Sequence, residues 1–358
     1  MNILMIGVDK TSLGGMLTVI ENYINCEEFL KKTNLIYIPT VINRCKLLKI
    51  VFFFRALVKI LITIISKKIN IIHVHMSEKS SVFREGIIIL LGKLFRCKTI
   101  IHLHGATFEK WYKNQISIVQ KMVRYIFNNA DKVLVLGEIW KRSISNIMDN
   151  TDKIEVLYNA VNIPSNNLYS NNANNIIFLG VLIERKGIDD LLKAILKIKD
   201  DIPSSIRVKL YGVDVYGNIE EKIKSLNLER IVEYSGWINS ENKKECFSHA
   251  ILNILPSYNE GLPMSILETM AYGIPNISTN IAAIPEAISN GGEGILVQPG
   301  DISGISKAIL QIVNNPDLRS IYSINSYKKV NMKFNIKDHI DRVYNIYSNL
   351  RSEERRVG

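Results

Sequence analysis

The sequence predicts an α/β protein that contains two doubly wound parallel sheets. Short apolar runs alternate with helical stretches along the chain, and this order produces parallel sheets. The chain has 358 residues, 47% of them hydrophobic, which is enough for two α/β domains of ordinary size. A polar stretch, Pro164 to Asn175, separates two sets of runs and has the composition of a linker.

These observations divide the chain into an N-terminal domain over residues 1–163, a linker over 164–175 and a C-terminal domain over 176–334. Residues 335–350 have the aromatic and aliphatic spacing of one further helix. Residues 351–358 show no apolar periodicity, so we leave them out of the fold prediction and suspect a non-native tail.

The cysteines and the start of the chain indicate a cytoplasmic protein. No two cysteines form a C-x-x-C pair, so neither a disulfide framework nor a cysteine metal site is expected. They are Cys26, Cys45, Cys97 and Cys246. No basic leader precedes the first apolar run, which reads as a strand and not as a signal peptide.

The first elements are a strand, a glycine-containing loop and a helix. Ile3 to Gly7 is the strand, Val8 to Gly15 is the loop, and Met16 to Tyr23 has helical periodicity. Backbone N–H groups in such a loop can bind phosphate. The loop matches neither a dinucleotide fingerprint nor a P-loop, so the alternative for Gly14 and Gly15 is a tight turn.

The most apolar segment is Lys46 to Lys68, and cations interrupt it before it reaches the length of a membrane span. As a helix it places its six cations within a little over half of its circumference and a broad apolar face opposite. We expect either a helix that lies in a membrane interface or a helix that packs on the sheet with its lysines in water.

The basic charge of the chain lies entirely in its first half. Residues 1–165 contain 23 Lys and Arg against 12 Asp and Glu, whereas residues 166–358 contain 22 of each. An anionic partner for the N-terminal domain is therefore expected, either a phospholipid surface or a lipid-linked diphosphate. Nucleic acid is not expected, because the basic stretches lack interleaved aromatic residues.

Two strand ends carry an H-x-H pattern, His73 with His75 and His102 with His104. Residues i and i+2 of a strand share a face, so each pair presents two imidazoles together and could hold a metal. Only His249 and His339 remain, and neither stands in a further motif of this kind. We therefore predict no metal site and no metal cofactor.

The C-terminal domain alternates strands with helices in the same way. Its expected strands are Ile176 to Leu179, Arg207 to Tyr211, Ile231 to Tyr234, Ile251 to Leu255, Asn276 to Ser278 and Ile295 to Val297. Ligands of such sheets bind outside the carboxyl ends of the strands. Arg185 and Lys186 follow the first of these strands, where two adjacent cations suit a diphosphate. Arg185 could equally be a solvated surface charge.

The segment Leu255 to Pro275 places two carboxylates at the ends of one turn-and-helix unit. Pro263 suits a helix start, so Glu260 is expected in the preceding loop and Glu268 inside the helix, roughly 10 Å away. This separation is too long for one metal ion but suits the two ends of a nucleotide-sugar. The alternative is that both carboxylates are ordinary solvated residues.

Together with Ile284 to Glu286 and Gly294 to Val297, this segment resembles the retaining GT-B glycosyltransferases of family 4, also called glycosyl transferases group 1. The resemblance is strongest from Asn174 to Asp301. It implies the GT-B fold, in which two Rossmann-like domains face a central cleft. Tyr158 to Val161 resembles the hinge of that family, whose last helix crosses back to the first domain.

The resemblance also assigns roles to residues. Glu260 would contact hydroxyls of the donor sugar and Glu268 the ribose, with Gly261 and Leu262 beside them in the donor site. Gly14 and Gly15 would approach the donor phosphates, and His104 would lie near the reacting sugar. Lys186 and Arg185 would stabilise the leaving diphosphate.

The sequence departs from the family pattern in two places. Val181 stands where the family usually has an arginine, which makes Arg185 a substitute for that residue. Ala282 and Ala283 replace the usual glycines before Ile284.

The function implied is a retaining, metal-independent glycosyltransferase, placed in the cytoplasm or at the inner face of the membrane. It would move a sugar from a nucleotide diphosphate sugar to a lipid-linked or saccharide acceptor, in the biosynthesis of cell-surface polysaccharide. Two alternatives stay open: a nucleotide-sugar epimerase or hydrolase of the same fold, and a basic peripheral membrane protein with a vestigial donor site.

Overall fold

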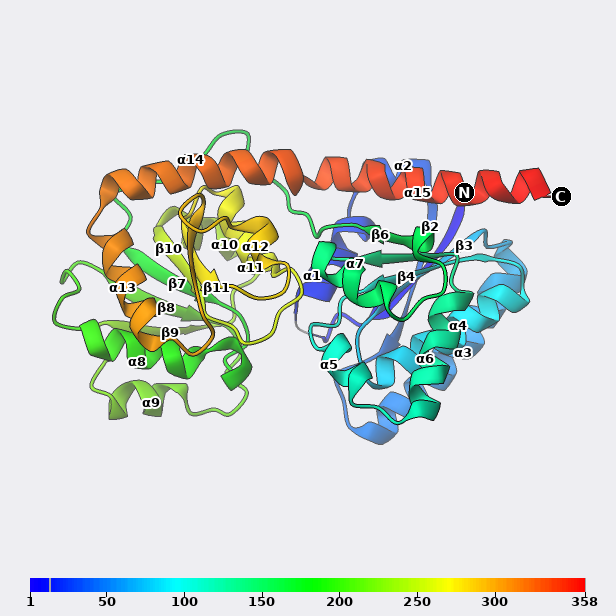
Figure 1. The fold of residues 1–358 in the computed structure, drawn as a ribbon, viewed down its shortest axis with the longest axis horizontal. Helices are drawn as coiled ribbons and strands as arrows, with labels where there is room; N and C mark the ends of the chain where they lie inside the picture. Colours follow the sequence, from blue (N-terminus) through cyan, green and yellow to red (C-terminus); the bar gives the residue numbers. More distant parts are fainter. Residues whose placement is uncertain (13, 358) are drawn as a thin grey trace. The chain divides into compact units, whose positions relative to one another are not determined.

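The computed structural model describes residues 1–12 and 14–357, which fold into two compact α/β units (Figure 1). Unit 1 comprises Met1–Asn159 and the C-terminal segment from Ile336, and unit 2 comprises Ala160–Asn335. Each unit contains one six-stranded sheet, and every described strand pair in both sheets is parallel. The predicted fold class is confirmed.

The sheet of unit 1 has the strand order β2-β1-β3-β4-β5-β6. Its strands are β1 (Asn2–Val8), β2 (Asn34–Val41), β3 (Ile71–Met76), β4 (Lys98–Leu103), β5 (Lys132–Val135) and β6 (Ile154–Val156). Its helices are α1 (Gly15–Ile24), α2 (Glu27–Lys32), α3 (Lys46–Lys67), α4 (Ser80–Leu94), α5 (Phe108–Lys113), α6 (Ser117–Asn129), α7 (Glu138–Ser145), the short η1 (Thr151–Lys153) and α15 (Ile336–Val357). The strand order reverses between β1 and β3, so the loops after these two strands meet at one edge of the sheet.

The sheet of unit 2 has the strand order β12-β11-β10-β7-β8-β9. Its strands are β7 (Asn175–Leu179), β8 (Arg207–Tyr211), β9 (Val232–Gly236), β10 (Ala250–Leu255), β11 (Asn276–Thr279) and β12 (Gly294–Val297). Its helices are η2 (Glu184–Lys186), α8 (Ile188–Ile198), α9 (Ile219–Ser225), α10 (Ser240–Ser248), α11 (Met264–Ala271), α12 (Ile284–Ala287), α13 (Ile302–Val313) and α14 (Pro316–Lys333). Here the order reverses between β7 and β10, and this is where a doubly wound sheet binds ligands.

One strand, β2, was not predicted from the sequence. It contains Pro39, which has no N–H to donate and argues against a strand in the middle of a sheet. In the structure β2 is an edge strand that pairs only with β1, where Gly7 lies opposite Pro39. A proline is tolerated at such an edge, where its missing N–H is not needed for a second strand.

The segment predicted as a linker, residues 164–175, lies within unit 2. The Asn167 side-chain amide donates to Ser323 Oγ at 2.9 Å, and the Tyr327 hydroxyl donates to the Pro164 carbonyl at 2.7 Å. The polar residues of this segment therefore bind α14. The chain instead passes between the units after Asn159.

The last helix, α15, belongs to unit 1. Its Arg342 guanidinium forms an ion pair with Glu155 at 3.1 Å, and its Tyr347 is fully buried. The helix continues to Val357, so it includes most of the segment that we left out of the fold prediction. Gly358 lies outside the described residues.

Glycine lets the loops after β7 and β10 approach each other. Gly187 has a φ of 72°, in the left-handed region, and a Cβ atom there would lie 2.1 Å from the Pro256 carbonyl oxygen. Real Cβ atoms do not come so close to a backbone oxygen, so a side chain at Gly187 would push the two loops apart. The Tyr258 N–H also donates to the Arg185 carbonyl at 2.8 Å across the same contact.

We expect Gly187→Ala to lower the melting temperature of unit 2 clearly more than Gly217→Ala does. Both glycines have φ near 70°, so both changes carry a left-handed strain of about 1–2 kcal/mol. Only Gly187 adds a collision, because nothing lies within 4 Å of a Cβ at Gly217. Calorimetry of both variants tests this, and equal losses would contradict the close approach.

Candidate functional site

The candidate site of unit 2 lies at the carboxyl ends of β7 and β10. Residues 180–187 follow β7, and residues 256–263 lead from β10 into α11. These segments hold most of the residues that the sequence analysis selected. The sequence predicted that these residues follow the ends of strands. The structure shows in addition that the two strands, β7 and β10, are neighbours in the sheet, so the residues that follow them lie close together.

Lys186 and Glu260 form the central contact of this site. The Lys186 ammonium lies 2.5 Å from Glu260 Oε1, and the Ser257 hydroxyl donates to the same oxygen at 2.7 Å. The side chains are 15% and 7% exposed, so both charges are largely removed from water. A buried carboxylate needs a cation and hydrogen bonds to remain charged, and it has both here.

The hydrogen bonds to Glu260 leave part of the carboxylate available. Among the described residues, both bonds go to Oε1. A carboxylate oxygen can accept two hydrogen bonds, and an ammonium carries three donors. Oε2 of Glu260 and further N–H groups of Lys186 can therefore bind a ligand without breaking the ion pair.

Arg185 lies beside this pair but is exposed. Its guanidinium Nη1 donates to the Asn259 carbonyl at 2.6 Å, next to Glu260 in the chain. This contact holds an exposed cation against the loop that carries Glu260. The sequence selected Arg185 as a candidate cation but could not predict its contact with the Asn259 carbonyl.

The helix start after Glu260 is built as the sequence predicted. Pro263 is the N-cap of α11, which begins at Met264 and ends at Ala271. Leu262 is buried, and the Gly261 carbonyl accepts from the Ala283 N–H at 3.2 Å. The first turn of α11 is thereby held against the segment before α12.

Glu268 lies inside α11 and has a partner that the sequence analysis missed. The Lys243 ammonium on α10 donates to Glu268 Oε1 at 2.7 Å, and both side chains are largely buried. Nothing in the local sequence links these residues, because helix packing brings them together. Glu268 is therefore a fixed carboxylate and not a solvated one.

The three remaining predicted residues, Gly14, Gly15 and His104, lie in unit 1. Gly14 has a φ of 134°, a Cβ there would meet nothing within 4 Å, and α1 begins at Gly15. The loop is thus an open backbone turn at a helix start, compatible both with the tight turn and with phosphate binding.

His104 follows β4 and is half-buried. Its Nε2 lies 2.9 Å from His75 Nδ1, and the two nitrogens share a hydrogen bond. Burial lowers the pKa of the His104 ring to about 3, so the ring is neutral at pH 7. It can donate or accept a hydrogen bond there but carries no positive charge.

Two family descriptions match the chain. Residues 22–164 match glycosyltransferase family 4, and residues 162–329 match glycosyl transferases group 1. The second region contains every predicted site residue of unit 2.

Known proteins of similar sequence and structure agree with these matches. A UDP-Gal:alpha-D-GlcNAc-diphosphoundecaprenol alpha-1,3-galactosyltransferase of Escherichia coli is 22% identical over 87% of this chain and 82% of its own length. Sucrose-phosphate synthase from Thermosynechococcus elongatus superposes with a TM-score of 0.81 at 18% identity, over 98% of this chain and 99% of the other. Anabaena HepE in complex with UDP-glucose gives a TM-score of 0.77 at 15% identity, over 97% and 99%. The fold and the family matches agree, and the chain belongs to the GT-B glycosyltransferases of family 4.

Proposed function

We propose that this glycosyltransferase moves a sugar from a nucleotide diphosphate sugar to a lipid-linked or saccharide acceptor, with retention at the anomeric carbon and without a metal ion in the transfer step. The role proposed is the assembly of cell-surface polysaccharide. The Lys186–Glu260 pair carries the proposal, because it holds a cation and a carboxylate at the position where unit 2 would bind a ligand.

The Lys186–Glu260 pair suits the two parts of a nucleotide-sugar donor, the sugar and the diphosphate, which are joined by the bond that breaks. Glu260 Oε2 would accept hydrogen bonds from hydroxyls of the sugar. The free N–H groups of Lys186, with Arg185, would bind the diphosphate, whose negative charge grows as it leaves. Fixed protein cations thus take the role that Mg²⁺ has in other sugar transferases.

The transfer step proposed occurs on one face of the sugar. The bond from the anomeric carbon to the diphosphate oxygen breaks, and the acceptor hydroxyl oxygen bonds to the same face. Its proton passes to an oxygen of the leaving diphosphate. His104 in unit 1 would position the reacting sugar as a neutral hydrogen-bonding group, and the open turn at Gly14 and Gly15 would contact the phosphates.

Nucleotide binding is the first test of this proposal. Purified protein is melted with UDP, GDP, ADP and their sugar conjugates, with and without EDTA. A ligand at 100 times its dissociation constant adds about 2.7 kcal/mol of stability. We expect the nucleotides of one base to raise the melting temperature, with or without EDTA. In a separate assay with the matching nucleotide sugar, we expect sugar transfer only when an acceptor is present. Sugar release or rearrangement without an acceptor would instead indicate a hydrolase or an epimerase.

We expect Glu268→Gln to weaken binding of the nucleotide by roughly 1–3 kcal/mol, which is the value of a hydrogen bond to a charged group. Among the described residues, Lys243 binds Oε1 of Glu268, so Oε2 is available for the ribose hydroxyls. Glu241→Gln on the neighbouring α10 is the control, because Glu241 is exposed. Titration calorimetry with the nucleotide diphosphate compares the two, and equal affinities would refute the ribose contact.

Lys186→Met tests whether the central pair acts on the reaction or only on stability. Breaking a buried ion pair leaves a carboxylate without its cation, so we expect a loss of about 2–3 kcal/mol after allowing for its partial exposure. The double variant Lys186→Met with Glu260→Gln removes both charges and should regain most of that stability. It should not regain turnover.

Kinetics of the double variant separate the roles further. If Lys186 stabilises the leaving group, kcat falls more than donor affinity does. A double variant with normal turnover would show that the pair is structural.

The helix α3 supports an acceptor at a lipid surface. Only three of its apolar side chains are buried, Ala56, Ile60 and Ile64. Its large exposed apolar side chains are 40–70% accessible and are Leu47, Leu48, Ile50, Val51, Phe54, Val58, Ile62 and Ile65. The cations Lys46, Lys49, Arg55, Lys59, Lys67 and Lys68 are exposed as well.

This composition fits an anionic phospholipid surface, where the apolar side chains enter the interface and the cations meet the headgroups. In the described part of the chain no helix is long and apolar enough to pass through a bilayer. The E. coli relative carries a lipid carrier, diphosphoundecaprenol, in the name of its acceptor. A lipid-linked acceptor would be reached most easily from such a surface.

We expect replacement of Lys46, Lys49, Arg55 and Lys59 by Gln to reduce binding to phosphatidylglycerol vesicles in a salt-dependent way. The same replacement of four exposed lysines of unit 2, Lys193, Lys224, Lys244 and Lys307, removes equal charge and is the control. Vesicle sedimentation at two salt concentrations measures both. Equal binding by the two variants would remove α3 from the proposal.

A further inference from the structure

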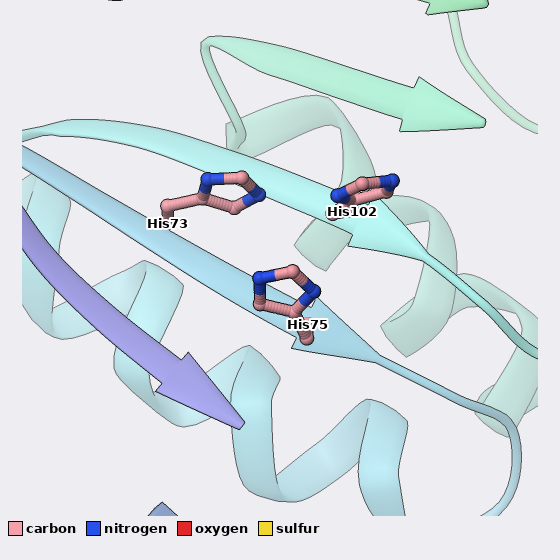
Figure 2. A group of neighbouring side chains, drawn as sticks. All are labelled: His73, His75 and His102. Carbon is pink, nitrogen blue, oxygen red and sulfur yellow. The ribbon is translucent and has the colours of Figure 1, made fainter. Parts of the chain in front are cut away.

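A cluster of buried histidines in unit 1 has no part in the proposed transfer step. His73 and His75 lie on β3 and His102 on β4, and the sheet register pairs His75 with His102. All three side chains therefore project from the same face of the sheet. Figure 2 shows the three rings gathered over β3 and β4. They are at most 1% exposed.

The hydrogen bonds of these rings leave one nitrogen or more of each without a partner. His73 Nδ1 lies 2.5 Å from the Tyr347 hydroxyl, and His75 Nδ1 lies 2.9 Å from His104 Nε2. Among the described residues, Nε2 of both rings and both nitrogens of His102 are buried with no hydrogen-bond partner. An unpaired buried polar atom lowers the stability of the folded chain, and here three neighbouring side chains carry such atoms.

The three rings lie close enough together to share one ligand. One nitrogen from each of the three rings lies within 4.8 Å of the other two. Three nitrogens bound to one zinc ion at about 2.0–2.1 Å would be separated by roughly 3.3 Å in tetrahedral geometry. The planes of His73 and His75 are 13° apart, so binding of one ion requires the rings to turn until their nitrogens face a common point.

We propose that His73, His75 and His102 bind one divalent transition-metal ion, with Zn²⁺ as the best match. Imidazole nitrogens suit Zn²⁺ and its neighbours, whereas Mg²⁺, Ca²⁺ and Mn²⁺ favour oxygen ligands. The site is thus of a different kind from a metal that would bind the donor diphosphate. It reverses our prediction from the sequence that the H-x-H histidines hold no metal, because the register between β3 and β4 brings His102 to the other two. It goes beyond the proposed transferase activity and does not depend on it.

Two of the three proposed ligands have the outer hydrogen bonds that orient metal-binding histidines, whereas His102 has none among the described residues. A histidine ligand normally donates its second ring N–H to a neighbouring acceptor, which fixes the ring. His73 has the Tyr347 hydroxyl of α15 as this neighbour, and His75 has His104 Nε2. If Nε2 of His75 binds the metal, the ring proton of His75 lies on Nδ1. In the hydrogen bond between the two rings, His75 Nδ1 is then the donor and His104 Nε2 the acceptor.

The test uses the untagged full chain, produced with zinc in the medium and dialysed. We expect about one zinc per chain by elemental analysis, and a melting temperature that a strong chelator lowers and Zn²⁺ restores. His102→Asn should lower zinc content at least tenfold. His249→Asn should leave it unchanged, because His249 lies outside the cluster at the end of α10.

A spectroscopic measurement on the unmodified protein keeps the proposal testable if His102→Asn fails to fold. Replacement of zinc by Co²⁺ should give the intense visible bands of a tetrahedral site, and X-ray absorption should show three imidazole nitrogens at about 2.0–2.1 Å. A zinc content below a tenth of an equivalent, a spectrum without imidazole ligands, or equal zinc in both variants would overturn the proposal.

Discussion

The buried ion pair between Lys186 and Glu260 is the contact on which the candidate site of unit 2 depends. The two residues are 74 positions apart and stand on loops that follow different strands. Neither charge could stay in this poorly hydrated position alone, because the cost of removing an ion from water is several kcal/mol. The pair, the Ser257 hydroxyl and the close approach at Gly187 hold both loops in one arrangement. Under the proposed function, stability and donor binding in unit 2 are therefore coupled through the same atoms.

The sequence alone predicted the features that depend on a repeating pattern or on a few adjacent residues. The position of Pro263 predicted the start of α11, and the alternation of strands and helices predicted both parallel sheets. The edge strand β2, which contains Pro39, was not among the predicted strands. The polar segment before β7 has the composition of a linker, yet Asn167 and its neighbours bind α14.

Contacts between side chains on different strands or helices could not be predicted from the sequence. Lys186 and Glu260 were both selected from the sequence, but their contact depends on β7 and β10 being neighbours. Lys243, which binds Glu268, stands in a helix with no motif of its own. The H-x-H patterns likewise indicate which imidazoles share a strand face. Only the register between β3 and β4 shows that His102 joins His73 and His75.

The candidate site of unit 2 and helix α3 of unit 1 manage charge in opposite ways, and this difference fits the roles proposed for them. In unit 2, Lys186 and Lys243 are paired with carboxylates and largely withdrawn from water, an arrangement that positions a small ligand. In unit 1, α3 exposes both its cations and its apolar side chains. Exposed apolar groups on a monomer promote association, and the surrounding positive charge opposes it through repulsion between copies. An anionic lipid surface removes both penalties at once, because it neutralises the cations and buries the apolar groups. This balance of penalties is the physical reason for which we propose a lipid interface for α3.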